Sequence, residues 1–255
     1  PADTFSKDLH PDLRADYIIA NPPFNIKDWG QPNLLEDPRW KYGVPAEKNA
    51  NFGWVQHMIH HLSNNGMAGF VLANGSLSSA IKGEADIRQA IIEADLLDCI
   101  VALPDKLFYN TGIPACLWFI TKNKADRKFR DRRGETLFID CQQMGEMISR
   151  TQRELSSDLL EQIRKTYMAW RGDEDCDQEY EDKLGFCKAT HIEDIKVKNF
   201  KITPGKYVGI TPIKDNGEPF EEKMKRLTFG LKSHFENSRR LEDEIRKNME
   251  GFGFD

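Results

Sequence analysis

The sequence predicts an α/β fold built on a mostly parallel sheet. Short continuous apolar runs alternate with segments of helical periodicity over residues 15–121, and this order of strand, helix, strand, helix and strand is typical of parallel sheets. The runs hold few polar residues, as do strands that are covered on both faces. With 255 residues, the chain is long enough for one large domain or two small ones.

The first strand is predicted over residues 15–20, where an apolar run is stopped by Asn21-Pro22-Pro23. Three further apolar runs predict strands over residues 67–73, 99–103 and 116–121. The last two are joined by the loop 104–114, which has no helical pattern. We therefore expect the strand at 116–121 to return in the antiparallel direction and close the sheet.

Two helices are predicted between these strands. Residues 49–63 carry apolar side chains at helical spacing, and a turn at residues 64–66 ends the pattern. Residues 84–94 form the second helix, with Ile87 and Ile91 on one face.

After residue 121 the composition changes, and a mixed region is predicted. Residues 122–133 carry seven basic and two acidic side chains, which fits either a phosphate-contacting segment or a solvated loop. A short strand is predicted over residues 137–140, a solvated acidic loop over 172–182 and a turn over 203–205.

Two longer helices are predicted in the C-terminal half. The first covers residues 157–171, and its start is ambiguous because Thr151 and Asp158 both begin a capping-box pattern. Residues 219–249 form a second helix, or two, because their apolar residues recur at steps of four and three between charged ones.

The composition excludes several classes of protein. The net charge is −5, and no apolar run approaches the roughly 20 residues of a membrane helix. Membrane proteins, secreted miniproteins, collagen-like chains and highly basic coat proteins are therefore excluded, although a local basic patch can still bind DNA. The five cysteines form no CxxC pair, so we expect free thiols in a cytoplasmic protein, without a zinc site or a disulfide framework.

The tetrapeptide Asn21-Pro22-Pro23-Phe24 is the most specific local motif. Average residue usage predicts it in roughly one in a thousand chains of this length. Proline lacks an N–H and fixes φ, so the turn is stiff and its carbonyl groups stay free to accept hydrogen bonds. Asn21 adds a side-chain oxygen, and Phe24 adds a flat apolar face. Two acceptors beside a stacking surface suit a planar ring that bears an amino group.

Such a site has a definite chemical use. The amino nitrogen of a purine is a poor nucleophile because its lone pair is delocalised, and two acceptors on its N–H bonds favour a tetrahedral nitrogen whose lone pair points at a methyl donor. The rate gain would come from positioning and electrostatics, and in duplex DNA the base must first be flipped out. The alternative is that Asn-Pro-Pro is only a loop after a strand.

The motif and its surroundings resemble a known family. Asn21-Pro22-Pro23-Phe24 is similar to the fourth motif of amino-methyltransferases that use S-adenosylmethionine, especially adenine-N6 DNA methyltransferases. Longer blocks resemble the modification (methylase) subunit of type I restriction-modification systems, in family order, at residues 20–29, 51–58, 69–78, 107–119 and 203–209. The resemblance covers nearly the whole chain. It implies a class I methyltransferase-like, Rossmann-like sheet followed by a helical C-terminal tail.

The resemblance implies a role for each site residue. Asn21 and the carbonyl of Pro22 would hold the target amino group, next to Pro23, and Phe24 would stack on the adenine. Phe108 lies where such enzymes carry a second aromatic ring against the flipped base, and the alternative is an ordinary core residue. The family also implies S-adenosylmethionine as methyl donor, DNA as substrate, and the specificity and restriction subunits as partners in a hetero-oligomer.

The resemblance further implies that part of the family's domain lies outside this chain. In the family, a glycine-rich turn and an acidic residue bind the methyl donor, and both precede the Asn-Pro-Pro-Phe motif. This chain starts too close to that motif to contain them, so only the later strands of the sheet are expected and Asn21 is the one candidate contact to the donor. We divide the chain into a substrate half at 1–123, a mixed α/β extension at 124–215 and a helical assembly tail at 216–255.

Other interpretations stay open. The chain could serve as an inactive assembly or DNA-binding module, because the donor-binding half is missing. It could also methylate RNA or a protein glutamine, since an amide presents the same donors. His57, His60 and His61 invite a metal site, but there is no HExxH and no evident carboxylate ligand. Surface or interface histidines are favoured, and no metal is expected.

Overall fold

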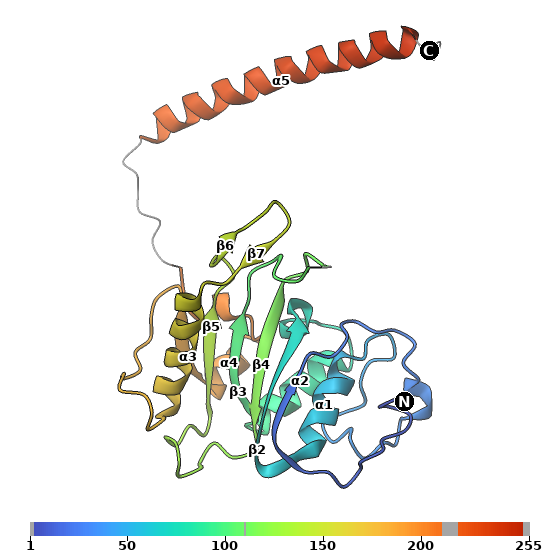
Figure 1. Ribbon diagram of the computed structural model, residues 1–255, viewed down its shortest axis with the longest axis vertical. Coiled ribbons are helices and arrows are strands. Elements are labelled where there is room, and N and C mark those ends of the chain that lie inside the picture. Colours follow the sequence, from blue (N-terminus) through green and yellow to red (C-terminus); the bar gives the residue numbers. More distant parts are fainter. Residues whose placement is uncertain (1–2, 110, 211–218, 252–255) are drawn as a thin grey trace. The chain divides into compact units, whose positions relative to one another are not determined.

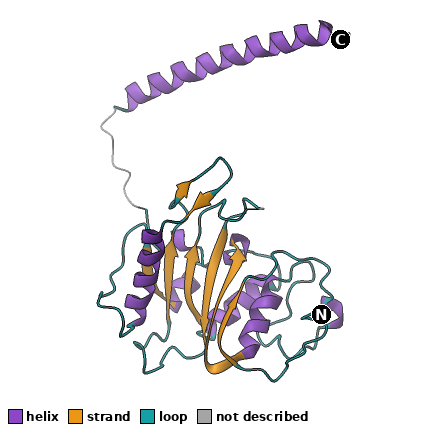
Figure 2. Cartoon of the chain, in the orientation of Figure 1, coloured by secondary structure: helices purple, strands orange, loops and turns teal. Residues whose placement is uncertain are grey.

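The computed structural model describes residues 3–109, 111–210 and 219–251, and the chain divides into two units, Pro1–Thr211 and Pro212–Asp255 (Figures 1 and 2). The first unit holds a mixed sheet with helices on both faces. The second holds a single helix, α5 (Phe220–Gly251), which confirms the predicted helix as one rather than two. None of the helices in the described ranges combines the length and apolar character needed to cross a bilayer.

A six-stranded sheet forms the centre of the first unit, in the order β1-β2-β4-β3-β5-β8. Four strands run in one direction, and β4 and β8 run against them. The predicted antiparallel closing strand is therefore confirmed: β4 lies between β2 and β3 and pairs with both. The strands are β1 (Ala15–Ala20), β2 (Leu62–Ala73), β3 (Leu97–Ala102), β4 (Ala115–Thr121), β5 (Glu135–Asp140) and β8 (Cys187–His191).

The sheet separates two apolar cores. On one face, α1 (Asn51–His61), α2 (Glu84–Glu93) and α4 (Ile192–Val197) pack against alternate strand residues such as Ile100 and Trp118. On the other face, α3 (Ser157–Arg171) covers Val101 and Ile139. Neighbouring residues of β3 thus enter opposite cores, as the period of two in a strand requires. This burial on both faces explains the continuous apolar run of β3.

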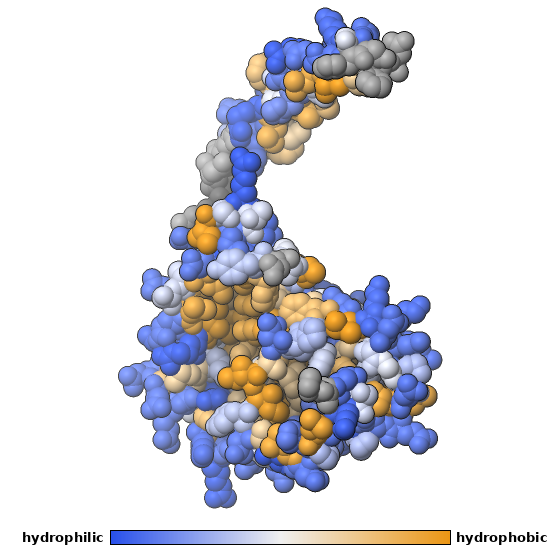
Figure 3. All heavy atoms as spheres, turned by 45° about the vertical axis from the view of Figure 1, so that its right-hand side comes forward, coloured by the Kyte–Doolittle hydropathy of each residue, from blue (hydrophilic) through white to orange (hydrophobic). Residues whose placement is uncertain are grey.

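Strand β1 is an edge of the sheet among the described residues, since it pairs only with β2. Its Ile18 packs on the core beside α1. On the opposite face, Tyr17 is 76% exposed and Ile19 is 94% exposed. Figure 3 shows that apolar side chains gather on one hollowed face of the first unit. An edge strand with exposed apolar side chains is uncommon in a soluble domain, because such an edge can pair with another chain.

Strand β2 begins earlier than predicted, at Leu62, directly after α1. The pairing register with β1 shifts between Ala15 and Tyr17, because residues 63–66 bulge out of the ladder. A Cβ atom on Gly66 would lie 2.7 Å from the carbonyl oxygen of Ala15. The turn residues that were expected to end the helix therefore also let β1 and β2 approach closely.

The mixed region after residue 121 holds elements that the sequence did not reveal, namely β8, α4 and a two-stranded ribbon of β6 (Glu146–Met147) and β7 (Arg153–Glu154). Neither capping candidate of α3 is correct: Ser156 is the N-cap, and its Oγ accepts from the backbone N–H of Leu159 at 3.2 Å. Both β5 and β8 belong to the same sheet as β1 to β4. The domain division at 123 and 215 stays a prediction.

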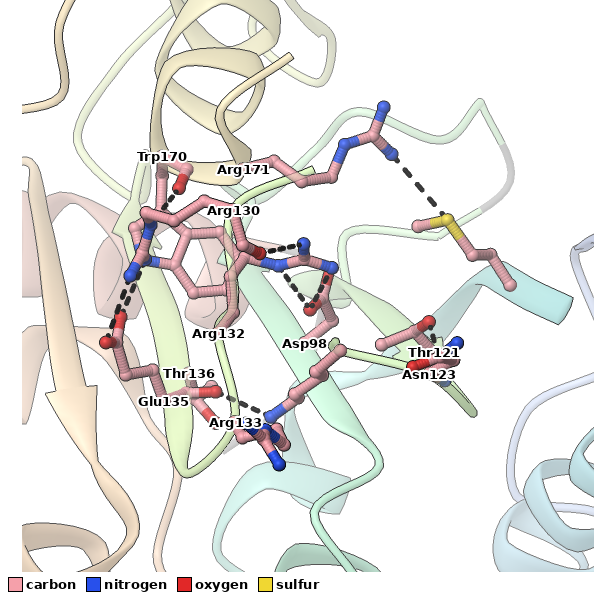
Figure 4. Close-up of polar contacts among 12 residues, drawn as sticks. Asp98, Thr121, Asn123, Arg130, Arg132, Arg133, Glu135, Thr136, Trp170 and Arg171 are labelled. Atoms are coloured by element: carbon pink, nitrogen blue, oxygen red, sulfur yellow. Dashed lines mark hydrogen bonds and ion pairs between the residues drawn. The ribbon is translucent and has the colours of Figure 1, made fainter. Parts of the chain in front are cut away.

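The basic segment 122–133 is only partly a solvated loop, which corrects that expectation. Arg132 is 1% exposed and Lys124 is 4% exposed. The Nζ of Lys124 donates to Asp95 at 2.6 Å, and the guanidinium of Arg132 donates twice to Asp98, at 3.3 and 3.2 Å. Figure 4 shows Arg132 reaching under Trp170 to Asp98. These two basic side chains form ion pairs in the protein interior and therefore cannot contact a phosphate group.

All five cysteines are free thiols, as expected. Four of them are buried, and burial raises the pKa of Cys116 and of Cys141 to about 12. A thiol with so high a pKa is inert at neutral pH, so these cysteines act as small apolar core residues.

Candidate active site

The candidate site lies where β1 ends. Asn21, Pro22, Pro23 and Phe24 follow directly on Ala20, the last residue of β1. Pro22 is buried, Phe24 is half-buried, and Asn21 and Pro23 are exposed. Among residues 3–109, 111–210 and 219–251, no donor pairs with the side-chain oxygen of Asn21 or with the carbonyl of Pro22. Asn21 and Pro22 also line a cavity, so these two acceptors keep their hydrogen-bonding capacity for a ligand.

The start of α1 holds the turn that follows the motif. Asn25 has a left-handed backbone with a φ of 54°. Its backbone N–H donates to Oδ1 of Asn51 at 2.9 Å, and Nδ2 of Asn51 donates back to Oδ1 of Asn25 at 3.0 Å. Asn51 is 2% exposed. Sequence reasoning missed this pair, although both residues lie in the blocks that carry the family resemblance. Asn51 fixes the exit of the chain from the motif.

A second segment brings an aromatic ring to the same place. The carboxyl ends of β1 and β3 lie at one edge of the sheet, and the loop after β3 carries Phe108. The rings of Phe24 and Phe108 are 6.1 Å apart and nearly perpendicular, at 84°. Phe108 is half-buried, so it differs from the core residues of the strands. The structure thus brings together all the residues that were singled out as the site.

The neighbouring loop residues are less informative. Tyr109 is 91% exposed, and Oγ1 of Thr111 accepts from the backbone N–H of Ile113. Asn110, the residue between them, lies outside the described residues. Phe108 and Thr111 form an isolated bridge, which narrows the loop at its tip.

A cavity of about 510 Å³ adjoins Asn21 and Pro22 on the side of α1. Its walls are apolar in the main and include Leu9, Ile18 and Met58. Trp54 also lines the cavity, and its indole N–H is buried without a partner among the described residues. An unpaired buried donor costs about 1–3 kcal/mol.

Two histidines of α1, His57 and His61, also line this cavity. His61 is buried and bonds Asp8 through Nε2 at 2.8 Å and the carbonyl of Leu13 through Nδ1 at 3.1 Å. His57 contacts the guanidinium of Arg39 through Nδ1 at 3.2 Å. The expectation of surface or interface histidines is therefore wrong for His61, and Asp8 is the carboxylate that the sequence did not reveal.

These contacts explain the cluster without a metal ion. One ligand atom each from Asp8, His57 and His61 lies within 4.8 Å of the others, but both nitrogens of His61 already face oxygen partners and Arg39 places a positive charge against His57. Burial would raise the pKa of Asp8, yet hydrogen bonds from His10 and His61 lower it. The cluster ties the segment before β1 to α1.

The stability of the protein should depend on pH through His57. Burial, together with the positive charges of His61, Arg39 and His60 and against the charge of Asp8, lowers the pKa of His57 from 6.5 to about 4. The unfolded chain then binds more protons between these pH values, so the free energy of unfolding falls as pH drops from about 6.5 towards 4. We expect this group to contribute a loss of about 1–2 kcal/mol, allowing for solvent screening.

Denaturant unfolding between pH 4 and 7.5 checks this expectation. The variant His57→Gln keeps an acceptor for Arg39 and should flatten the acid limb, whereas His10→Gln, at an exposed position, should not. Equal slopes for wild type and His57→Gln would show that another group carries the dependence.

Comparison with known proteins decides the family. The family model for N-6 DNA methylases matches residues 1–216. The chain belongs to the N-6 DNA methylase family. This assignment agrees with the Asn-Pro-Pro-Phe motif at the end of β1.

The curated relatives within this family are methylase subunits of type I restriction enzymes. The methylase subunit of the type I restriction enzyme HindI from Haemophilus influenzae is 48% identical over 254 residues, which cover 100% of this chain and 55% of that protein. The MjaIX methylase subunit from Methanocaldococcus jannaschii is 40% identical and is covered to 45%. The resemblance to type I methylase subunits is therefore confirmed. The chain spans about half the length of the curated relatives it matches.

Solved structures of methylase subunits share the fold. The type I methyltransferase subunit from Streptococcus thermophilus superposes with a TM-score of 0.70 at 26% identity, over 82% of this chain and 42% of that one. The M protein of EcoKI gives a TM-score of 0.56 at 17% identity, which shows a common fold. The predicted class I methyltransferase-like sheet, with a helical tail after it, is confirmed.

Proposed function

We propose that this chain forms the target-base site of a type I adenine-N6 DNA methyltransferase subunit, which transfers a methyl group from S-adenosylmethionine to adenine N6. One observation carries the proposal: two acceptors without a partner among the described residues, the side chain of Asn21 and the carbonyl of Pro22, lie beside the Phe24–Phe108 pair at the carboxyl ends of the parallel strands. The similarity to the HindI and MjaIX methylase subunits supports DNA as the substrate.

Each site residue has a distinct task in this proposal. The oxygens of Asn21 and Pro22 accept the two N–H bonds of the adenine amino group and favour a tetrahedral nitrogen. Phe24 stacks on the flipped base, and Phe108, nearly perpendicular to it, closes one side of the pocket. Pro23 stiffens the turn, so little geometry has to change when the base arrives. No strong base is needed, because the proton can leave after the transfer.

The methyl donor fits the described residues only in part. S-adenosylmethionine supplies an electrophilic methyl group when bound. The cavity beside Asn21 offers apolar walls, but the one carboxylate in its lining, Asp8, is bonded to His61. No glycine-rich turn follows a strand in the described ranges. We propose that other parts of the subunit complete the donor site along the open edge of β1, with Asn21 as the contact from this chain.

The product of the reaction tests the function. The gene product that contains this chain is assembled with its specificity subunit, incubated with DNA and S-adenosylmethionine, and the nucleosides are analysed by mass spectrometry. We expect N6-methyladenine from DNA. Methylated RNA nucleosides or a methylated glutamine would favour the alternative substrates, and no product of any kind would favour the inactive assembly or DNA-binding module.

The helix α5 is proposed as the arm that binds a partner subunit, with the specificity and restriction subunits as members of the complex. Its apolar side chains form a stripe that is 45–75% exposed within its own unit, at Phe220, Met224, Leu227, Leu231, Phe235, Leu241, Ile245 and Met249. Such a stripe with charged flanks suits packing against another helix. We place the complex in the cytoplasm, where the five free thiols would persist.

Assembly can be measured by co-purification of the methylase and specificity subunits. Replacing Leu227 and Leu231 with aspartate should abolish the complex, because two charges would then lie in the apolar contact between α5 and the partner helix. Phe229→Asp is the matched control, since Phe229 is 77% exposed and lies on another side of the helix. If the double variant assembles like the wild type, α5 is not the arm.

A further inference from the structure

The β6–β7 ribbon stands apart from the main sheet and is bonded to the loop that carries Phe108. Glu146 pairs with Glu154 and Met147 with Arg153. A ribbon of two-residue strands is not stable alone in water. Its position must therefore come from its contacts with the rest of the chain, and these contacts concentrate on the residues just before Phe108.

Four contacts join the ribbon to this loop. The backbone N–H of Arg153 donates to the carbonyl of Lys106 at 2.9 Å, and Nζ of Lys106 donates to the carbonyl of Arg150 at 3.2 Å. The amide Nε2 of Gln152 donates to the carbonyl of Leu107 at 3.2 Å. The guanidinium of Arg153 lies 3.6 Å from the carboxylate of Asp105. Three consecutive residues before Phe108 are thus tied to one element.

The loop needs this support because its backbone is unusual. Lys106 has a left-handed backbone with a φ of 60°, which costs a residue other than glycine about 1 kcal/mol or more. The ribbon is shaped to meet the loop: Gly145 has a φ of 82°, and a Cβ there would lie 2.6 Å from the carbonyl of Glu154. The guanidinium of Arg153 also donates to the carbonyls of Met144 and Gly145. The loop before Phe108 and the β6–β7 ribbon therefore hold each other in place.

We propose that the β6–β7 ribbon sets the position of Phe108 against the extrahelical base, with Gln152 as a positioning residue. The inference rests on the proposed function, since it assumes that a flipped adenine stacks on Phe24 and is bounded on one side by Phe108. Gln152 touches no reacting atom. Its amide holds the peptide between Leu107 and Phe108, and so fixes the direction in which the ring leaves the loop.

The experiment compares Gln152→Ala and Gln152→Glu with Gln143→Ala in the full methylase subunit assembled with its specificity subunit. Glutamate keeps the size of the side chain but cannot donate to Leu107. Gln143 is exposed, lies before the ribbon, and has no side-chain hydrogen bond to another described residue. Base flipping is followed on a duplex with 2-aminopurine in place of the target adenine, whose fluorescence rises when the base leaves the stack. Because 2-aminopurine has no 6-amino group, kcat is measured on the matching duplex with adenine at that position.

Both Gln152 variants should lower kcat by about 10- to 100-fold and reduce the fluorescence rise, while the melting temperature and the duplex Kd stay at wild-type values. Gln143→Ala should match the wild type. Wild-type fluorescence and kcat in both Gln152 variants would overturn the ribbon proposal alone. A wild-type enzyme that methylates DNA adenine without any fluorescence rise would also overturn it, whereas a wild type without adenine methylation would overturn the proposed function and this inference together.

Discussion

Replacing Asn21 with alanine is expected to lower the rate of adenine methylation by at least about 100-fold, the loss typical when one preorganised group at a developing charge is removed. The side chain is exposed, and its oxygen has no partner among the described residues, so its removal breaks no contact of the folded chain. The loss should appear in kcat and not in the duplex Kd. Radiolabelled methyl transfer under single-turnover conditions measures it directly.

Two further variants define this result. Asn33→Ala changes an exposed asparagine of the same chain that makes no side-chain hydrogen bond to a described residue, and it should behave as the wild type. Asn21→Asp keeps the shape of the side chain and one acceptor oxygen, but it adds a negative charge next to the positively charged methyl donor. Its methylation rate should therefore lie between the rates of Asn21→Ala and Asn33→Ala. Wild-type activity in Asn21→Ala would remove this residue from the mechanism.

Replacing Asp98 with alanine is expected to lower the free energy of unfolding by about 3–5 kcal/mol, the usual cost of leaving one member of a buried ion pair alone. Asp98 is fully buried and Arg132 is 1% exposed. The carboxylate also accepts from the hydroxyl of Tyr167 at 2.6 Å, and burial, together with the Asp98 charge, raises the pKa of Tyr167. The network joins β3, the segment before β5 and α3, as Figure 4 shows in part.

Denaturant unfolding of the variants tests this network. Tyr167→Phe removes one of the bonds to Asp98 and should cost about 1 kcal/mol. Asp131→Ala breaks an exposed ion pair with Arg133 in the same segment and should leave the unfolding midpoint unchanged. If Asp98→Ala is as stable as Asp131→Ala, the buried pair does not stabilise the fold.

The elements that sequence reasoning predicted correctly are those with a strong local pattern. The run at 99–103 is continuous because both faces of β3 are buried, and β2 has one buried and one half-buried face over residues 67–73. The run before Asn21 is apolar although Tyr17 and Ile19 are exposed on one face of β1. The direction of β4 followed from its connection, which is too short for a crossover helix. By contrast, β8 is a polar, five-residue edge strand, and only its pairing with β5 makes it a strand.

The residues of the site show the same contrast between a local sequence pattern and contacts that form only on folding. The Asn-Pro-Pro-Phe motif is contiguous, so its chemistry can be derived from four neighbouring residues. The pair of Asn25 and Asn51 is separated by 26 residues, and that of Asp8 and His61 by 53. Neither pair has a periodicity, because its contacts are created by the packing of α1 on β1. Polar groups that meet only in the folded chain leave no local pattern to find.

The place of β4 in the sheet has a consequence for how the molecule is made. β4 is later in sequence than β2 and β3, yet it lies between them and is hydrogen-bonded to both. During synthesis, β2 and β3 therefore each keep an edge without a hydrogen-bonding partner until β4, which ends at Thr121, has left the ribosome. Non-local pairing of this kind is slow and exposes apolar strands to aggregation. Insertion of β4, with Trp118 fully buried, is the step that joins the β1–β2 pair to β3.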